Sequence, residues 1–162
     1  MHQLQAYASR KEGVIYVTVS GFLSNSCYTA RIADKYPGGN IVYVRDPGEA
    51  QVFVEEGVKP GSEICLMVLV PWVGHVKIVD DEHDKMSIFI NDERALTVQI
   101  QDEAKNYRVI ALTSAGTDPY MGCSVIPSDA PYLAIYSSVY GPASKGDCEK
   151  WVSENCTTPP DL

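Results

Sequence analysis

The sequence has few basic residues and no long apolar segment. Thirteen Lys and Arg residues stand against 21 Asp and Glu residues, which gives a formal net charge of −8. Nucleic acids and anionic membrane surfaces are bound through clustered Lys and Arg, so the charge balance disfavours both. The most apolar run, Ile64 to Val70, is too short to span a bilayer. We therefore expect no nucleic-acid partner and no membrane span.

Residues 1–13, MHQLQAYASRKEG, lack the apolar core of a secretory signal peptide. The chain is therefore either cytoplasmic or the mature form of an exported protein whose leader has been removed. Cysteine usage bears on this choice. None of the five cysteines belongs to a C-x-x-C pair, which disfavours zinc and thioredoxin-like redox sites. Either all thiols are free, or two disulfides and one spare thiol form in an oxidising compartment. We favour the second alternative, and with it an extracytoplasmic or secreted location.

Catalytic motifs are also missing. No serine lies in a G-x-S-x-G context, and the glycine-rich stretches 37–40 and 57–61 do not precede a helix, as a phosphate-binding loop would. His75 has no second histidine at metal-ligand spacing. The acidic run Asp80 to Asp84 could bind a hard cation such as Ca²⁺, but it lacks the EF-hand pattern and is more typical of a solvated hairpin turn. We expect no catalytic residue, no cofactor and no metal site, and we predict that the protein is not an enzyme.

Short β-type segments separated by turn residues fill the first hundred residues. In the run 14–19, Ile15, Val17 and Val19 would share one face of a strand, which Gly21 and the cluster Ser24-Asn25-Ser26 break. Further strands are expected at 27–33, 41–45, 52–55, 75–79, 86–90 and 96–100. The run Ile64 to Val70 is apolar at every position, which predicts a strand buried on both faces. Strands at this spacing, joined by polar turns, predict an antiparallel sandwich or barrel.

The chain changes character after about Asp102. Strands are expected at 107–112 and 132–140, followed by a helix over 144–155 with Ser144 as its N-cap. On the second strand, one face would carry the candidate binding residues Tyr132, Tyr136 and Tyr140, next to Trp151 of the helix. Such an aromatic face can bind a peptide or sugar, but it is more often the surface on which a helix packs, here through Trp151 and Val152.

Several short runs in the first part of the chain carry a family resemblance. They are V-T-V-S-G-F-L at 17–23, Cys27-Tyr28, C-L-M-V-L-V-P-W at 65–72 and M-S-I-F-I-N-D at 86–92. With them, residues 14–101 resemble the small immunoglobulin-like β-sandwich modules of bacterial exported proteins and lipoproteins. The predicted fold is therefore mainly β: an immunoglobulin-like antiparallel β-sandwich over 1–102, then a small α+β segment over 103–162 with one C-terminal helix. The resemblance carries no catalytic site, because these modules share none.

Two cysteine pairings are predicted. Cys27 and Cys65 both belong to predicted core strands, and a sandwich often joins its two sheets by such a bridge. Cys148 and Cys156 are eight residues apart on the predicted helix, so their Cα atoms would lie about 12 Å apart, beyond the reach of about 7 Å for a disulfide. Cys123 therefore pairs with one of them. We favour Cys156, at the helix end, with Cys148 packed as a free thiol.

These observations predict a non-catalytic binding or structural module of an exported protein, with an unknown protein or small ligand as its partner. One alternative is an inhibitor of the protease type that presents a disulfide-braced loop. The other is an enzyme or accessory subunit whose site the sequence does not reveal. A rigid convex loop would favour the inhibitor, whereas a pocket with converging polar groups and shifted pKa values would favour the enzyme.

Overall fold

The computed structural model describes residues 1–33, 48–61 and 64–157. The chain divides into two compact units, Met1–Glu103 and Ala104–Leu162. Each unit has its own sheet, and each is described by itself below.

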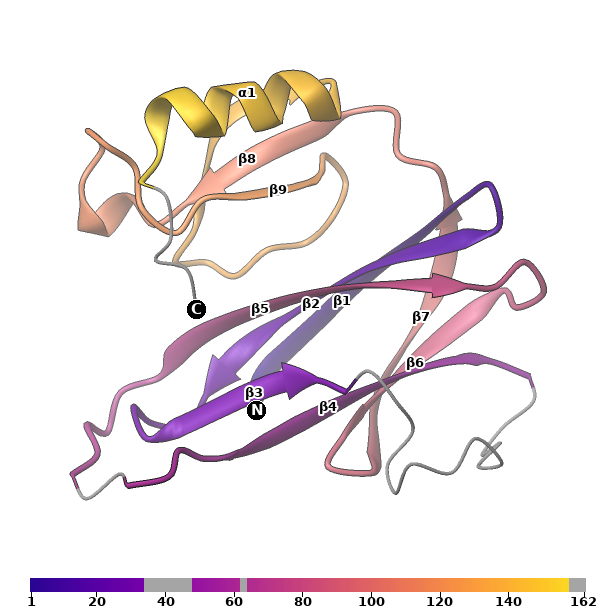
Figure 1. Ribbon diagram of the computed structural model, residues 1–162, viewed down its shortest axis with the longest axis horizontal. Helices are drawn as coiled ribbons and strands as arrows, with labels where there is room; N and C mark the ends of the chain where they lie inside the picture. The colour runs from indigo at the N-terminus through magenta and orange to yellow at the C-terminus, as the bar shows by residue number, and fades with distance from the viewer. Residues whose placement is uncertain (34–47, 62–63, 158–162) are drawn as a thin grey trace. The chain divides into compact units, whose positions relative to one another are not determined.

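The first unit is built around one seven-stranded mixed sheet (Figure 1). Its strands are β1 (His2–Lys11), β2 (Val14–Leu23), β3 (Tyr28–Ile32), β4 (Ala50–Val58), β5 (Val70–Val79), β6 (Lys85–Ile90) and β7 (Glu93–Asp102). Their order across the sheet is β3-β4-β6-β7-β1-β2-β5. The β4–β6 and β1–β7 pairs are parallel, and the other neighbours are antiparallel.

The core of this unit lies on one face of the sheet. Alternating apolar residues from four strands, β1, β2, β4 and β6, form it: Ala8, Ile15, Val17, Val19, Ala50, Val52, Val54, Met86 and Ile88. The sequence correctly predicted that Ile15, Val17 and Val19 share a face. Leu96, Val98 and Ile100 of β7 pack against the same cluster, whereas the intervening polar residues of β7 are exposed. The period of two along each strand therefore determines which side chains meet in the core.

The two edges of the sheet approach each other. The indole Nε1 of Trp72, on β5, donates a hydrogen bond of 3.0 Å to the carbonyl oxygen of Ala30, on β3. Ile32 and Trp72 both pack at the border of the core. Side-chain contacts therefore close the gap between the edge strands β3 and β5, which are not neighbours in the described sheet. The sheet is thus close to a barrel. The two stacked antiparallel sheets of an immunoglobulin-like sandwich are not confirmed, because the described strands form one continuous sheet that includes two parallel pairs.

Two tight hairpins contribute to the twist of this sheet. Glu12 and Gly13, between β1 and β2, both have positive φ angles, of 51° and 77°. Asn91 and Asp92, between β6 and β7, have φ angles of 47° and 71°. Two successive left-handed residues match the right-handed twist of the flanking strands, and Gly, Asn and Asp adopt this conformation at low cost.

Several predicted strand limits in this unit are wrong. Gly21 does not end β2, which continues to Leu23 and stops at the predicted Ser24-Asn25-Ser26 cluster. β4 is a nine-residue interior strand where a short strand at 52–55 was expected. The sequence interpretation also missed β1, whose inward-facing residues are mostly small. The turn expected at 37–40 and the strand expected at 41–45 lie outside the described residues.

The predicted buried strand from Ile64 to Val70 is wrong for all but its last residue. β5 begins at Val70, which pairs with Leu23, the last residue of β2. No described strand is paired with residues 64–69, and these residues are all exposed. An apolar sequence can predict burial, but a neighbouring strand must be present to provide it.

The second unit consists of a three-stranded antiparallel sheet and one helix (Figure 1). Its elements are β8 (Tyr107–Ala111), a 3₁₀ turn (Thr113–Ala115), β9 (Ser124–Pro127), β10 (Ser137–Ala143) and α1 (Lys145–Asn155). The strands are ordered β10-β8-β9, and α1 contacts all three. The Ser144 hydroxyl accepts a hydrogen bond of 3.1 Å from the Asp147 backbone N–H, which confirms the predicted N-cap.

The predicted strand 132–140 is wrong in its first half. β10 starts at Ser137, which pairs with Ala111, the last residue of β8. The residues before Ser137 lack a neighbouring strand, and the chain turns there through a hydrogen bond of 3.0 Å from Tyr136 N–H to the Leu133 carbonyl. Among the residues that the structure describes, no helix has the length and apolar character that crossing a membrane would require.

Candidate functional site

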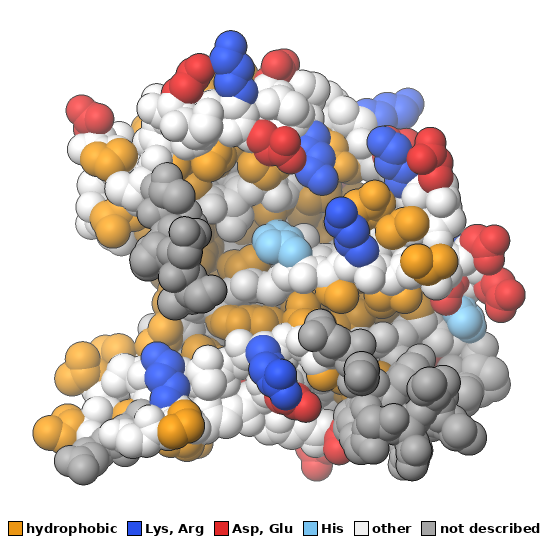
Figure 2. All heavy atoms as spheres, viewed as in Figure 1, with side chains coloured by type: hydrophobic (Ala, Val, Ile, Leu, Met, Phe, Trp, Pro, Cys, Tyr) orange, Lys and Arg blue, Asp and Glu red, His pale blue; other side chains and the backbone are white. Residues whose placement is uncertain are grey.

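The most unusual surface of the first unit is the segment 64–69, here called the tethered loop. It carries five exposed large apolar side chains: Ile64, Leu66, Met67, Val68 and Leu69. Ile64 and Met67 are 87% and 83% exposed. Figure 2 shows apolar side chains gathered where β4 ends and β5 begins. Single exposed apolar residues are common on proteins, but a contiguous group of this kind is typical of an interaction site.

Covalent and polar links hold the first half of the tethered loop. Cys65 forms a disulfide with the buried Cys27, with their Cα atoms 5.3 Å apart. The Leu66 backbone N–H donates to the Ser26 hydroxyl at 2.7 Å, and the Ser26 backbone N–H donates to the Leu66 carbonyl at 3.1 Å. Residues 65 and 66 are therefore fixed to the connection between β2 and β3.

A three-residue turn places Met67 at the tip of the loop. The Val68 N–H donates to the Leu66 carbonyl at 2.9 Å, which bends the chain around Met67. Within the described ranges, no hydrogen bond involves the backbone N–H or C=O of Met67. Two residues after Val68, the chain enters β5 at Val70 and is held by the ladder to β2. The result is a short convex loop, fixed on both sides, with an exposed apolar tip.

Both predicted disulfides are present. Cys27 pairs with Cys65, and Cys123 pairs with Cys156, whose Cα atoms are 6.4 Å apart. Cys148, on α1, is the free thiol and is fully buried, as expected. Burial raises the pKa of the Cys148 thiol, and the neighbouring acidic side chains raise it further. A thiol that is buried and protonated is a packing group and a poor nucleophile.

The structure does not assemble the predicted tyrosine face. Tyr136 is buried in the turn before β10, where burial raises its pKa, and only Tyr140 of the three predicted tyrosines stacks on Trp151. The Tyr140 and Trp151 ring centroids are 5.3 Å apart, and the ring centroid of Tyr120, which the sequence interpretation missed, lies 5.4 Å from that of Trp151. Tyr132 is partly exposed. These contacts place Trp151 in the packing between α1 and the sheet, as in the alternative interpretation of the aromatic residues.

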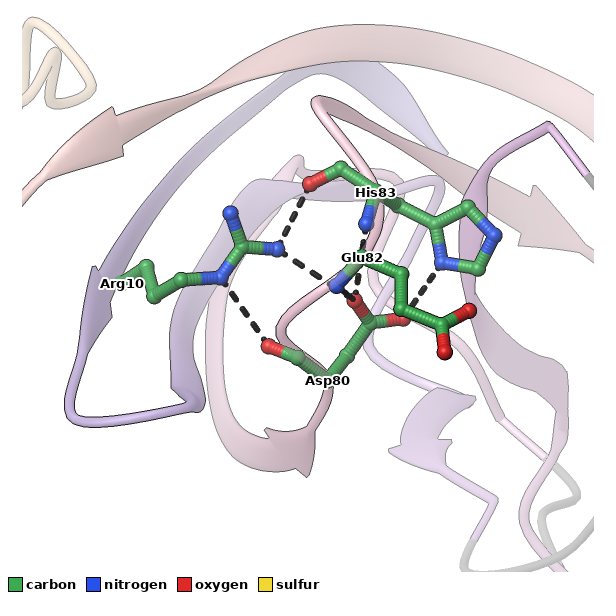
Figure 3. A network of polar contacts seen from close by, with 4 residues as sticks. All are labelled: Arg10, Asp80, Glu82 and His83. Carbon is green, nitrogen blue, oxygen red and sulfur yellow. Dashed lines mark hydrogen bonds and ion pairs between the residues drawn. The ribbon is translucent and has the colours of Figure 1, made fainter.

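The acidic run 80–84 forms a turn that is held by hydrogen bonds (Figure 3). The Asp80 carboxylate accepts from the backbone N–H groups of Glu82 and His83 at 2.9 and 3.0 Å. Arg10 donates to the carbonyl oxygens of Asp80 and His83 at 3.0 and 2.6 Å, which joins this turn to β1. Burial acts to raise the pKa of Asp80, but the hydrogen bonds and charge of His83 outweigh it and the pKa is lowered. Within the described ranges, no group of three or more His, Cys, Asp or Glu side chains is arranged to hold a metal ion.

A second polar cluster, which no sequence motif revealed, surrounds Glu49. Its fully buried carboxylate accepts from Ser87 and from Arg94, the latter at 2.6 Å, and Ser87 also contacts Thr97 at 2.7 Å. Burial acts to raise the pKa of Glu49, but the hydrogen bonds from Arg94, Ser87 and Gln51 outweigh it, so the pKa is lowered. The carboxylate is charged and paired, which is typical of a structural ion pair.

Two of the described surface hollows are open and are not lined by the carboxylates whose pKa values are shifted. One of ≈440 Å³ lies beside His83, and another of ≈720 Å³ lies beside Arg94. Catalytic sites usually bring together groups whose pKa values are shifted. The described carboxylates with shifted pKa values, Glu49 and Asp80, line neither hollow. The tethered loop is therefore a better candidate site than either hollow.

The resemblance of residues 14–101 to immunoglobulin-like modules stays a prediction, because the chain matches no protein-family model, no curated protein and no solved structure.

Proposed function

We propose that the protein is a non-catalytic binding module that contacts a partner protein through the tethered loop. The observation that carries this proposal is the fixed, contiguous group of exposed apolar side chains at 64–69. Transfer of a Val, Leu, Ile or Met side chain from water to a buried site stabilises a complex by about 1.5–3 kcal/mol. A protein that leaves five such side chains exposed therefore has a large driving force for binding.

The attachments of the loop also favour binding. Association costs free energy when it orders flexible side chains and segments, and a loop that is already ordered avoids part of that cost. Here the Cys27–Cys65 disulfide and the two hydrogen bonds to Ser26 order the loop before it meets a partner.

The same disulfide supports an extracytoplasmic location. Disulfides persist in oxidising compartments and are rare in the reducing cytoplasm. We propose that the protein functions where Cys27–Cys65 and Cys123–Cys156 stay oxidised, since the binding loop depends on the first of these bonds.

The test compares the wild-type protein with a variant in which Leu66, Met67 and Val68 are all changed to Ser. Proteins retained by the immobilised wild type from an extract of its own cells are identified, purified and titrated individually. We expect the loop variant to bind the identified partner at least about 30-fold more weakly, the effect of losing one interface hot spot. Val79→Ser is the matched control, because Val79 is 89% exposed at the other end of β5. Unchanged affinity in the loop variant, with a wild-type circular dichroism spectrum, would contradict the proposal.

A further inference from the structure

We infer that the partner of the tethered loop is an endopeptidase with an apolar specificity pocket, and that Met67 fills this pocket, so that the protein is a peptidase inhibitor. This inference rests on the proposed function of the loop. It names the class of partner that fits the shape and chemistry of residues 64–69.

The shape of the loop points to a concave partner that binds polypeptide backbone. Met67 is 83% exposed at the tip of a three-residue turn, and no hydrogen bond involves its backbone within the described ranges. A peptidase cleft binds a peptide segment through main-chain hydrogen bonds and places one side chain in a pocket that determines specificity. The tip of the tethered loop offers both elements: backbone groups that can form new hydrogen bonds, and a long apolar side chain.

The attachments on both sides of Met67 explain why the loop would inhibit a peptidase instead of serving as its substrate. On the N-terminal side, Cys65 is bonded to Cys27 and Leu66 is hydrogen-bonded to Ser26. On the C-terminal side, Val70 is paired with β2. Only residues 66–69 lie between the disulfide and the strand. Cleavage after Met67 would leave both new ends held on the same unit, next to each other.

This arrangement disfavours release of a cleaved product. Two ends that the fold holds together react at a high effective concentration, so re-formation of the peptide bond competes with dissociation. The cleaved loop also gains little conformational freedom, because each new end is only two or three residues from a fixed point. A peptidase would therefore remain occupied by the loop.

The test measures inhibition of three purified peptidases by the oxidised, full-length protein. Chymotrypsin and subtilisin represent apolar pockets, and trypsin represents a pocket with a carboxylate at its base. We expect the wild type to inhibit at least one of the first two and to inhibit trypsin weakly. Met67→Gly should weaken that inhibition by about 30-fold or more, the effect expected for loss of a hot-spot side chain. Met67→Lys should reverse the preference toward trypsin. Val79→Ser is the control and should change inhibition less than twofold.

A second variant tests the role of the disulfide. The double substitution Cys27→Ser and Cys65→Ser removes the attachment on one side of Met67, so this protein should be cleaved between residues 67 and 68 and should lose inhibition. Mass spectrometry locates the cleavage, and circular dichroism checks that the sheet is retained. The inference is wrong if the wild type inhibits neither apolar-pocket peptidase, if Met67→Lys leaves the inhibition constants unchanged, or if the wild-type loop is cleaved as fast as an unfolded chain. In those cases, the proposed function still stands if the identified partner binds through the loop, and both fail if the loop variant binds as well as the wild type.

Discussion

Gly74 offers a sharp test of how the first sheet closes. It lies on β5 two residues after Trp72, on the same face of the strand. A Cβ atom added at Gly74 would lie 2.7 Å from Cη2 of Trp72 and 3.0 Å from Cδ1 of Ile32. The Trp72 ring would have to move, although its Nε1 is held by the 3.0 Å hydrogen bond to Ala30. We therefore predict that Gly74→Ala weakens the contact between β5 and β3.

Three contributions give the magnitude for Gly74→Ala. Overpacking of a filled site costs about 1–3 kcal/mol. Loss of the hydrogen bond between Trp72 and Ala30 adds about 1 kcal/mol. Replacing a strand glycine by alanine returns about 0.5–1 kcal/mol, because the unfolded chain loses freedom. The expected loss in the free energy of unfolding is therefore about 2 kcal/mol.

Urea unfolding followed by tryptophan fluorescence measures this loss. The chain has two tryptophans, so a Trp151→Phe background makes Trp72 the only reporter. Gly57→Ala is the matched control, since Gly57 is also in a strand and an added Cβ would meet nothing within 4 Å. That substitution should be neutral or stabilising by up to about 1 kcal/mol.

Removing the indole ring gives a further check. In a Trp72→Leu background, unfolding is followed by circular dichroism, and Gly74→Ala should then cost less than about 0.5 kcal/mol, because the group that it would displace is absent. The proposed closure would be refuted if Gly74→Ala were as stable as the wild type. It would equally be refuted if the cost were the same with and without the Trp72 ring.

Three further predictions concern the polar clusters, the free thiol and the helix. The pKa values of Glu49 and Asp80 are lowered in the folded state, so their contribution to stability is present above the ordinary carboxyl pKa of about 4 and is lost as the pH falls through the folded values. Glu49→Gln should therefore lower the urea midpoint of unfolding at pH 7 and make that midpoint decrease less steeply in acid. An unchanged dependence of the midpoint on pH would count against the ion pair. Cys148 should resist iodoacetamide in the folded protein, because it is buried and its pKa is raised, and it should react with one equivalent in urea. Rapid labelling without urea would mean that the thiol is accessible in the folded protein. Ser144→Ala should destabilise the second unit by about 1 kcal/mol, because it removes the N-cap. Ser153→Ala, at an exposed position within the same helix, should change the free energy of unfolding by less than about 0.5 kcal/mol. Equal effects of the two substitutions would argue against the cap.

Short-range patterns predicted the elements that depend on local chemistry. The alternation in β2 and β7 identified their buried faces, because side chains of a strand point to opposite sides whatever the strand packs against. The hydroxyl of Ser144 identified the start of α1, since it bonds to the backbone three residues later. The helix rise correctly excluded a Cys148–Cys156 bond, and the position of Cys156 at the helix end correctly favoured it over Cys148 as the partner of Cys123.

The tertiary structure decided where apolar segments are buried. Ile64 to Leu69 and the residues from Tyr132 to Tyr136 both have strand-like sequences, yet neither is a strand. In each case the neighbouring strand has ended, at Leu23 of β2 or at Ala111 of β8. A β-strand is stabilised by hydrogen bonds to a partner that can be distant in sequence, so strand composition alone does not determine whether a strand forms.

The candidate site was hidden from the sequence for the same reason. An apolar run at 64–69 predicts a core strand as long as its surroundings are unknown. Only the fold shows that Cys65 holds this run beyond the end of β2, with Met67 exposed at its tip. The sequence by itself determined the chemistry of the loop, because this follows from residue types. The Cys27–Cys65 pairing was predicted correctly, but from two core strands, and neither cysteine lies in a strand of the structure. The tertiary structure decided that this chemistry faces outward, because burial depends on which strands lie alongside.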